Sequence, residues 1–202
     1  MNEERRLSKA DRVGMYMSVG LVVVGAVMAI IDAVRRLKAV GDGTNVPVQV
    51  PLIGETASLP LGPDGAPVTA TVDTATVIVA NPAAATEFAL YAQPIWQALF
   101  VCAGLVVAAI FFLRVARGHA FSRGAVRLVY GAVAIVAVGW VGTSILTNMT
   151  TNGALSAISE YTYDSILFEV SLTPMLGILL LGAVAGALDI GERLQRDTEG
   201  LV

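Results

Sequence analysis

The chain has 202 residues, of which 55% are hydrophobic and only 14% are charged, and its formal net charge is −3. An ordinary soluble domain carries about 25% charged residues, so this composition excludes a soluble globular domain and indicates a membrane protein. The single cysteine, Cys102, excludes a disulfide within the chain.

Four apolar runs without a charged residue predict the fold class. Each run has 19 residues, and together they cover 13–31, 95–113, 128–146 and 170–188. At ~1.5 Å per residue, a helix of this length spans about 28 Å, which is close to the roughly 30 Å hydrocarbon core of a bilayer. Because the runs lack strict alternation, helices are favoured over barrel strands. We therefore predict an all-α integral membrane four-helix bundle. Its transmembrane helices are expected at 13–34, 95–113, 128–146 and 166–190.

The first run follows a short charged segment, residues 1–12. Its apolar stretch exceeds the roughly 7–15 residues of a secretory signal core. Arg35, Arg36 and Lys38 follow it where a signal peptide would carry a small-residue cleavage site. We expect an uncleaved signal anchor.

Residues 40–94 differ sharply from the runs on either side. They contain seven of the eight prolines and no basic residue, and VPVQVPLIG and APVTATVDTATVIVA alternate in polarity around the turn sequence GPDG. We predict a small β-rich insertion of two to four short strands, with its prolines placing the first strand at an edge or a bulge. Too small for a large core, it should pack on the helix ends. A helical lead capped by Asn81 should follow it.

The turn at 114–127 holds four arginines and the chain's only histidine. Gly118 is expected to end the second helix, Ser122 to cap the third, and Phe121 to pack on Val126. Direct nucleic-acid binding is not expected, because the turn lacks interleaved aromatic residues and a known binding fold. Its arginines indicate a cytoplasmic face, and a docking surface for a cytosolic partner is compatible with that assignment.

A second, polar connection is expected as a loop at 147–165. Glu160 and Asp164 lie four residues apart, which on a helix places both carboxylates on one face. A solvated face is the preferred interpretation of this pair, and a cation site is the alternative.

Pro174 near the start of the fourth run removes a backbone hydrogen bond and predicts a kink or hinge. Glu169, just before the run, is a candidate for proton or cation coupling if it points into the bundle. A charge among the lipid headgroups is preferred, because the four apolar cores contain no Asp, Glu, Lys, Arg or His.

Lysine and arginine are distributed asymmetrically along the chain. Ten of the thirteen lie before the first run, in the turn at 114–127 or after the fourth run, and none lies within 39–113 or 128–192. Because these residues concentrate on the cytoplasmic side of membrane proteins, both termini and the turn are expected in the cytoplasm. The exception is the basic group at 35–38, which this topology places at the outer surface.

The tail at 191–202 continues from Ile190 with Leu194 on the same helical stripe and charged residues around it. It is expected either to bind a partner together with the turn or to lie at the headgroups. The candidate partner surface comprises Arg114, Arg117, Phe121, Ser122, Arg123, Arg127, Glu192, Arg193, Leu194 and Arg196.

Small residues spaced by four favour close approach of membrane helices. Gly182 with Gly186 forms such a pair in the fourth run, and Gly25 and Gly104 belong to pairs in the first and second. Packing within the bundle is the preferred role, and a homo-oligomer is the alternative.

With one histidine and one cysteine, the chain offers neither a histidine-based triad nor a common zinc site. We expect a protein that is not an enzyme and that binds neither a cofactor nor a metal.

Two local signatures resemble those of a family of small bacterial four-span membrane proteins, domain of unknown function 2975. They are GHAFSRGAVRLVYGAVAI at 118–135 and ALDIGERLQRDTEGLV at 187–202, and the resemblance covers roughly residues 95–202. Ala187 and Leu188 depart from the family pattern, which has an acidic residue and phenylalanine there. The resemblance implies a bacterial plasma-membrane protein of unestablished biochemical role, often encoded beside a small helix-turn-helix regulator.

These features predict a regulatory or sensory membrane protein. Its outer insertion would sense a ligand or the state of the envelope, and its inner turn and tail would hold a cytosolic regulator of the helix-turn-helix type. Its expected partners are the lipid bilayer and that regulator. The alternative is a small transporter or channel subunit with Glu169 and Pro174 as its working parts.

Overall fold

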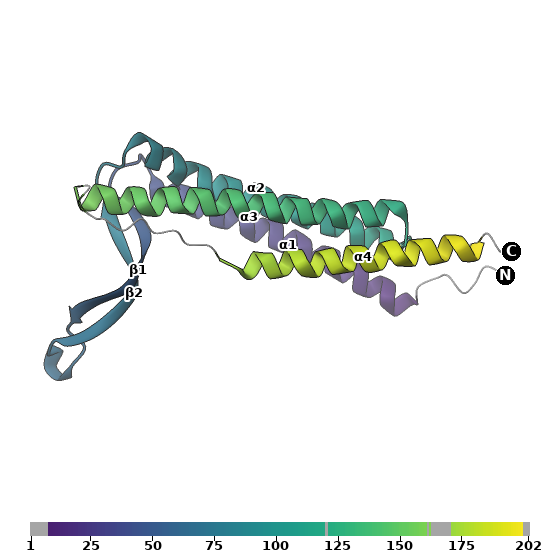
Figure 1. Cartoon of the computed structure of the whole chain (residues 1–202), viewed down its shortest axis with the longest axis horizontal. Helices are drawn as coiled ribbons and strands as arrows, with labels where there is room; N and C mark the ends of the chain where they lie inside the picture. The colour runs from purple at the N-terminus through teal and green to yellow at the C-terminus, as the bar shows by residue number, and fades with distance from the viewer. Residues whose placement is uncertain (1–7, 120, 161, 163–170, 200–202) are drawn as a thin grey trace. The chain divides into compact units, whose positions relative to one another are not determined.

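The computed structural model describes residues 8–119, 121–160, 162 and 171–199 and is mostly helical (Figure 1). Its elements are α1 (Lys9–Val40), β1 (Val46–Leu59), η1 (Pro63–Gly65), β2 (Val68–Val79), α2 (Ala84–Ala116), α3 (Arg123–Ile158) and α4 (Thr173–Glu199). Four of the described helices are long and apolar enough to cross a membrane. The expected four apolar helices and small β insertion are therefore confirmed, and the architecture is compatible with a helical bundle.

The chain falls into two compact units. The first contains Met1–Val34, Pro94–Thr143 and Val170–Val202, and the second contains Arg35–Gln93 and Ser144–Glu169. The first unit thus holds most of the apolar helical length. The second holds the sheet and the helix ends nearest to it.

The helical lead into the second apolar run forms as expected, but its cap is not Asn81. The helix α2 begins at Ala84, and the N–H of Glu87 donates to the carbonyl oxygen of Ala83 at 2.9 Å. Asn81 therefore lies two residues too early to serve as the N-cap, and Ala83 occupies that position.

The polar segment expected as a loop at 147–165 is largely helical, because α3 continues to Ile158. Its amide and hydroxyl side chains bond to carbonyls of their own helix one turn back. The Nδ2 of Asn148 donates to the carbonyl of Ser144 at 2.8 Å, and the Nδ2 of Asn152 donates to that of Asn148 at 2.9 Å. These side chains are satisfied locally, so their polarity does not end the helix.

The end of α3 removes the geometric basis for a carboxylate pair at 160 and 164. Glu160 lies beyond the helix with φ 51°, in the left-handed region. Asp164 lies outside the described residues. The helical spacing on which the pairing was predicted therefore does not hold at Glu160.

The predicted hinge at Pro174 is wrong, because α4 begins later than expected, at Thr173. The carbonyl of Leu172 accepts the N–H groups of Met175 and Leu176 at 3.1 and 3.3 Å, so Pro174 lies in the first turn. The N–H that proline lacks would have no partner within the helix at that position, so no hydrogen bond is lost.

The two strands form an antiparallel hairpin, paired from Val46 with Val79 to Leu59 with Val68 (Figure 1). The GPDG sequence makes the turn, with Asp64 at φ 57° and Gly65 at φ 79°. A register shift follows Pro51, so the predicted bulge in the first strand is confirmed.

The base of the hairpin lies in the core of the second unit. Val46, Val48, Val50 and Val79 are buried, and they share one cluster with the helix ends. The helical members of that cluster are Val40, Leu90, Ala154 and Leu155. Burying one such valine contributes roughly 1.5–3 kcal/mol. The shared cluster confirms the expectation that the insertion packs on helix ends.

Candidate functional site

The turn between α2 and α3 is ordered by a glycine and a pair of backbone hydrogen bonds. Gly118 has φ 80°, a conformation that costs glycine little. Its N–H donates to the carbonyl of Val115 at 2.9 Å, and the N–H of His119 donates to that of Arg114 at 2.9 Å. This is the Schellman arrangement that ends a helix, so the predicted role of Gly118 is confirmed.

Ser122 caps α3 as expected. Its Oγ accepts the N–H of Ala125 at 3.2 Å and donates to the carbonyl of His119 at 3.0 Å. The same hydroxyl therefore satisfies one free donor of α3 and ties the cap to the turn. A cap of this kind contributes about 1 kcal/mol.

The ring of Phe121 lies against α4 at Gly191. A Cβ built at Gly191 would stand 2.6 Å from the Cδ1 of Phe121, closer than real Cβ atoms approach. The ring thus occupies space that only glycine leaves open. The expected contact of Phe121 with Val126 stays a prediction.

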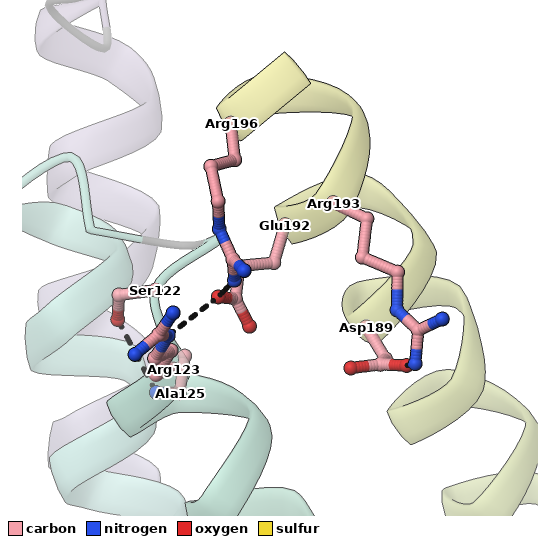
Figure 2. A network of polar contacts seen from close by, with 7 residues as sticks. All are labelled: Ser122, Arg123, Ala125, Asp189, Glu192, Arg193 and Arg196. Atoms are coloured by element: carbon pink, nitrogen blue, oxygen red, sulfur yellow. Dashed lines mark hydrogen bonds and ion pairs between the residues drawn. The ribbon is translucent and has the colours of Figure 1, made fainter. Parts of the chain in front are cut away.

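An ion-pair network joins α3 to α4 within the first unit (Figure 2). The Oε1 of Glu192 accepts a hydrogen bond from the Nε–H of Arg123 at 3.2 Å and also binds a guanidinium nitrogen of Arg196. The Glu192 side chain is only 13% exposed, against 69% for Arg123 and 55% for Arg196. The carboxylate is therefore enclosed while the two arginines face outward.

A second ion pair lies on α4 alone. Arg193 binds Asp189 one turn back, at 2.9 Å between Nη2 and Oδ2. Figure 2 shows this pair on the side of α4 away from Arg123. It offers a matched control, because it has the same chemistry without a contact between helices.

We call Phe121, Ser122, Arg123, Glu192 and Arg196 the turn–tail surface. Sequence reasoning expected these five residues to contribute to one surface, and the structure brings them together through Glu192 and the Phe121 contact. Gly191 was missed, since nothing in its local sequence reveals an aromatic ring seventy residues away.

The structure also describes the other expected members of the partner surface. The guanidinium of Arg114 covers Gly124, where an added Cβ would collide with it. Arg117 and Arg127 are exposed, and among the residues that the structure describes neither makes an ion pair. Leu194 is also exposed.

The glycines expected at helix contacts divide into two groups. A Cβ at Gly25 would meet the Leu105 side chain at 3.4 Å, and one at Gly104 would meet Ile135 at 3.9 Å. A Cβ at Gly182 or Gly186 would meet no described atom within 4 Å. The packing role expected of Gly182 and Gly186 therefore finds no partner within the described part of the chain.

Two glycines of α3 make the close contacts that spacing did not reveal. The Phe100 side chain would lie 2.8 Å from a Cβ at Gly139, and the Trp96 ring 2.3 Å from one at Gly142. The Trp96 Nε1 donates to the carbonyl of Gly139 at 3.2 Å. The aromatic side chains of α2 thus pack directly on the backbone of α3.

Among the described residues, no group of three or more His, Cys, Asp or Glu side chains could hold a metal ion. The Cys102 thiol lies 4.0 Å from the carbonyl of Ala26. Glu169, the candidate for coupling, lies outside the described residues, and Pro174 has lost its hinge role. No observation therefore favours the transporter alternative.

Comparison of the chain with protein-family models, curated proteins and solved structures finds no match. The resemblance to the domain of unknown function 2975 family stays a prediction from the two sequence signatures. The turn–tail surface and the four apolar helices are therefore the features that bear on function.

Proposed function

We propose that this chain is a four-span integral protein of the bacterial plasma membrane with both termini in the cytoplasm. The length and apolar character of the four helices support this placement. Large apolar side chains are exposed along all four, including Leu21, Leu99, Val138 and Leu180. Water would penalise such a surface by roughly 25 cal/mol per Å², whereas lipid tails cover it without cost.

The orientation follows from the basic residues. The turn–tail surface carries Arg123 and Arg196, with Arg114, Arg117 and Arg127 nearby, while residues 39–113 contain no lysine or arginine. Arginine-rich ends stay in the cytoplasm, so the hairpin emerges on the opposite side. The basic group at 35–38 is accommodated there because long cationic side chains reach the headgroup layer.

Within that topology the protein acts as a regulatory or sensory partner without enzymatic activity. The observation that carries this proposal is the enclosed Glu192, which joins an amphipathic helix end to the arginine turn as one surface. Phe121 on that surface is 50% exposed, and Ile190 and Leu194 are exposed on the other side of α4. An exposed aromatic ring beside arginines is typical of protein docking sites.

The partner that this surface would hold is a cytosolic regulator, and the family resemblance favours one of the helix-turn-helix type. Holding such a protein at the membrane keeps it from its target, and a signal received by the hairpin would release it. The protein itself needs no contact with nucleic acid.

Affinity capture from detergent extracts tests this proposal, with partners identified by mass spectrometry. Glu192→Gln removes the negative charge that joins the two helices, whereas Asp189→Asn removes only the charge of the pair with Arg193. We expect a specific partner with the unaltered chain and with Asp189→Asn, and its loss with Glu192→Gln or after deletion of 191–202. Recovery of the same partners without the tail, or of none with the intact chain, would refute the proposal.

A further inference from the structure

The hairpin carries its apolar residues on one face near the base and on the other face near the tip. Along β2, Val79, Val77 and Ala75 share one face with the buried base, whereas Val72, Ala70 and Val68 share the opposite face. The first strand follows the same change, since Ala57 and Leu59 pair with Ala70 and Val68. The change occurs at the bulge after Pro51.

We call the part beyond the bulge, from Glu55 paired with Val72 to the tip, the distal hairpin. Its side chains are absent from the core cluster of the described residues. Val68 is 43% exposed, and Leu61 at the turn is 69% exposed. A two-stranded hairpin alone is marginally stable in water, so this apolar face requires a cover.

The charge of the distal hairpin restricts what that cover is. Glu55 belongs to the apolar face, and Asp64 and Asp73 add two more negative charges nearby. No lysine or arginine occurs from residue 39 to residue 113. Anionic headgroups and another distal hairpin are both repelled, so the cover presents positive charge.

The basic surface nearest to the base of the hairpin lies at the end of α1. Arg35 and Lys38 are three residues apart and exposed, which places them on neighbouring parts of one helix side. Neither makes an ion pair with a residue that the structure describes. Val40, two residues after Lys38, belongs to the cluster that holds the hairpin base. The basic pair and the base of the hairpin therefore belong to the same end of the second unit.

The length of the hairpin carries its tip well beyond its own base. A strand rises roughly 3.3 Å per residue, so the 14 residues of β1 measure about 46 Å. The buried valines of β1 end at Val50. Its partner Ala75 lies seven residues from Val68 at the far end of the ladder, so the paired strands reach about 23 Å farther. A helix with its side chains is about 10–12 Å wide, so the distal hairpin is long enough to contact a neighbouring molecule.

We propose that the distal hairpin docks on the α1 end of a second copy of this chain. Glu55 pairs with Arg35 and Lys38 of the second copy, and Leu59 and Val68 lie against that helix. A second copy fits as the occupant because the end of its α1 supplies the exposed basic pair that complements the acidic distal hairpin. The inference rests on the proposed function in one respect, since both copies must cross the same bilayer in the same direction.

Cross-linking between two differently tagged full-length copies tests the docking in membranes. Both copies carry Cys102→Ala, so that only introduced thiols react. One copy carries Ala57→Cys on the docking face and the other carries Ala39→Cys beside Lys38, and a short bismaleimide is the probe. Ser58→Cys, on the opposite face of the same strand, replaces Ala57→Cys in the control pair. We expect cross-linked product with the first pair and roughly tenfold less with the control.

Charge reversal then separates docking from chance collision. Glu55→Lys in one copy, or Arg35→Glu with Lys38→Glu in the other, replaces attraction by repulsion and should lower the product roughly tenfold. Combining both reversals across the two copies should restore it. Product that is equal with the control pair, insensitive to reversal, or not restored by the combination would overturn the docking, as would a chain that remains monomeric.

Two further measurements keep this failure distinct from failure of the proposed membrane topology. The chain must sediment with membranes, and the thiol of Ser58→Cys, on the face away from the docking contact, must react with an impermeant maleimide from outside intact cells. If both results hold while charge reversal has no effect, only the docking is wrong. If either result fails, the topology is wrong and the docking falls with it.

Discussion

Replacing Gly153 by alanine tests the close contact between α2 and α3 in the second unit. A Cβ at this position would lie 2.0 Å from the Oγ1, 2.7 Å from the Cγ2 and 2.9 Å from the Cβ of Thr86. Thr86 is only 5% exposed. Its side chain is branched at the Cβ, so no rotamer removes all three collisions, and the helices must separate.

The magnitude follows from two opposing effects. Overpacking a core costs about 1–3 kcal/mol, and replacing glycine by alanine within a helix returns about 0.5–1 kcal/mol. With three atoms of Thr86 inside 3.0 Å, the cost lies near the upper end of its range, so the free energy of unfolding should fall by about 2 kcal/mol. For a chain of this size about 2–4 °C of Tm corresponds to each kcal/mol, so the Tm should fall by about 4–8 °C.

The assay is thermal unfolding in detergent, followed by circular dichroism. Gly131→Ala on the same helix is the matched control, because no described atom lies within 4 Å of its added Cβ, and its Tm should be unchanged or higher. In a Thr86→Ala background the two closest contacts are gone and only the one with the Cβ at 2.9 Å remains, so Gly153→Ala should cost clearly less. An equal loss of Tm in both backgrounds would refute the contact.

Three further predictions concern the turn between α2 and α3, its contact with α4, and the turn that follows α1. Ser122→Ala should lower the free energy of unfolding by about 1 kcal/mol through loss of the helix cap, and Ser122→Asp should recover most of it, as measured by the Tm. Gly191→Leu should displace the neighbouring aromatic ring and speed tryptic cleavage of the arginine turn, whereas Gly186→Leu should leave the cleavage rate unchanged. Hydrogen bonds from the Thr44 hydroxyl at 2.7 Å and N–H at 3.1 Å lower the pKa of Asp42 below its ordinary value. Stability from this carboxylate is thus present above its ordinary pKa and is lost as the pH falls through the folded value, and Thr44→Val should raise the pKa seen by carboxyl-carbon NMR.

Features fixed by neighbouring residues were predictable from the sequence. Gly118 and Ser122 end one helix and begin the next through bonds that span at most five residues. The alternation around GPDG likewise predicted the hairpin, and Pro51 predicted its bulge. Each of these signals acts over a single turn, so its spacing in the sequence contains the whole interaction.

Contacts between distant elements were not predictable. Arg123 and Glu192 lie 69 residues apart, and no local pattern selects that pairing from the other charges of the turn and tail. The spacing of Gly182 and Gly186 matches the pattern for close packing, yet Gly139 and Gly142 meet the aromatic rings. Periodicity identifies a helix face but does not say which neighbour that face receives.

The error at 147–165 has a different cause. Polar residues between apolar runs usually indicate a loop, but Asn148 and Asn152 bond to their own helix and extend α3. Polar side chains of this kind can form hydrogen bonds in a loop or in a helix. Only tertiary contacts, such as Ala154 and Leu155 packing on the hairpin base, decide in favour of the helix.

The most direct test of the membrane topology is thiol labelling in intact cells, on a Cys102→Ala background. Ser58→Cys reports on the hairpin and Arg117→Cys on the arginine turn. An impermeant maleimide should label the hairpin thiol at once and the turn thiol only after the cells are permeabilised. Labelling in the reverse order, or recovery of the chain in the soluble fraction, would contradict the account.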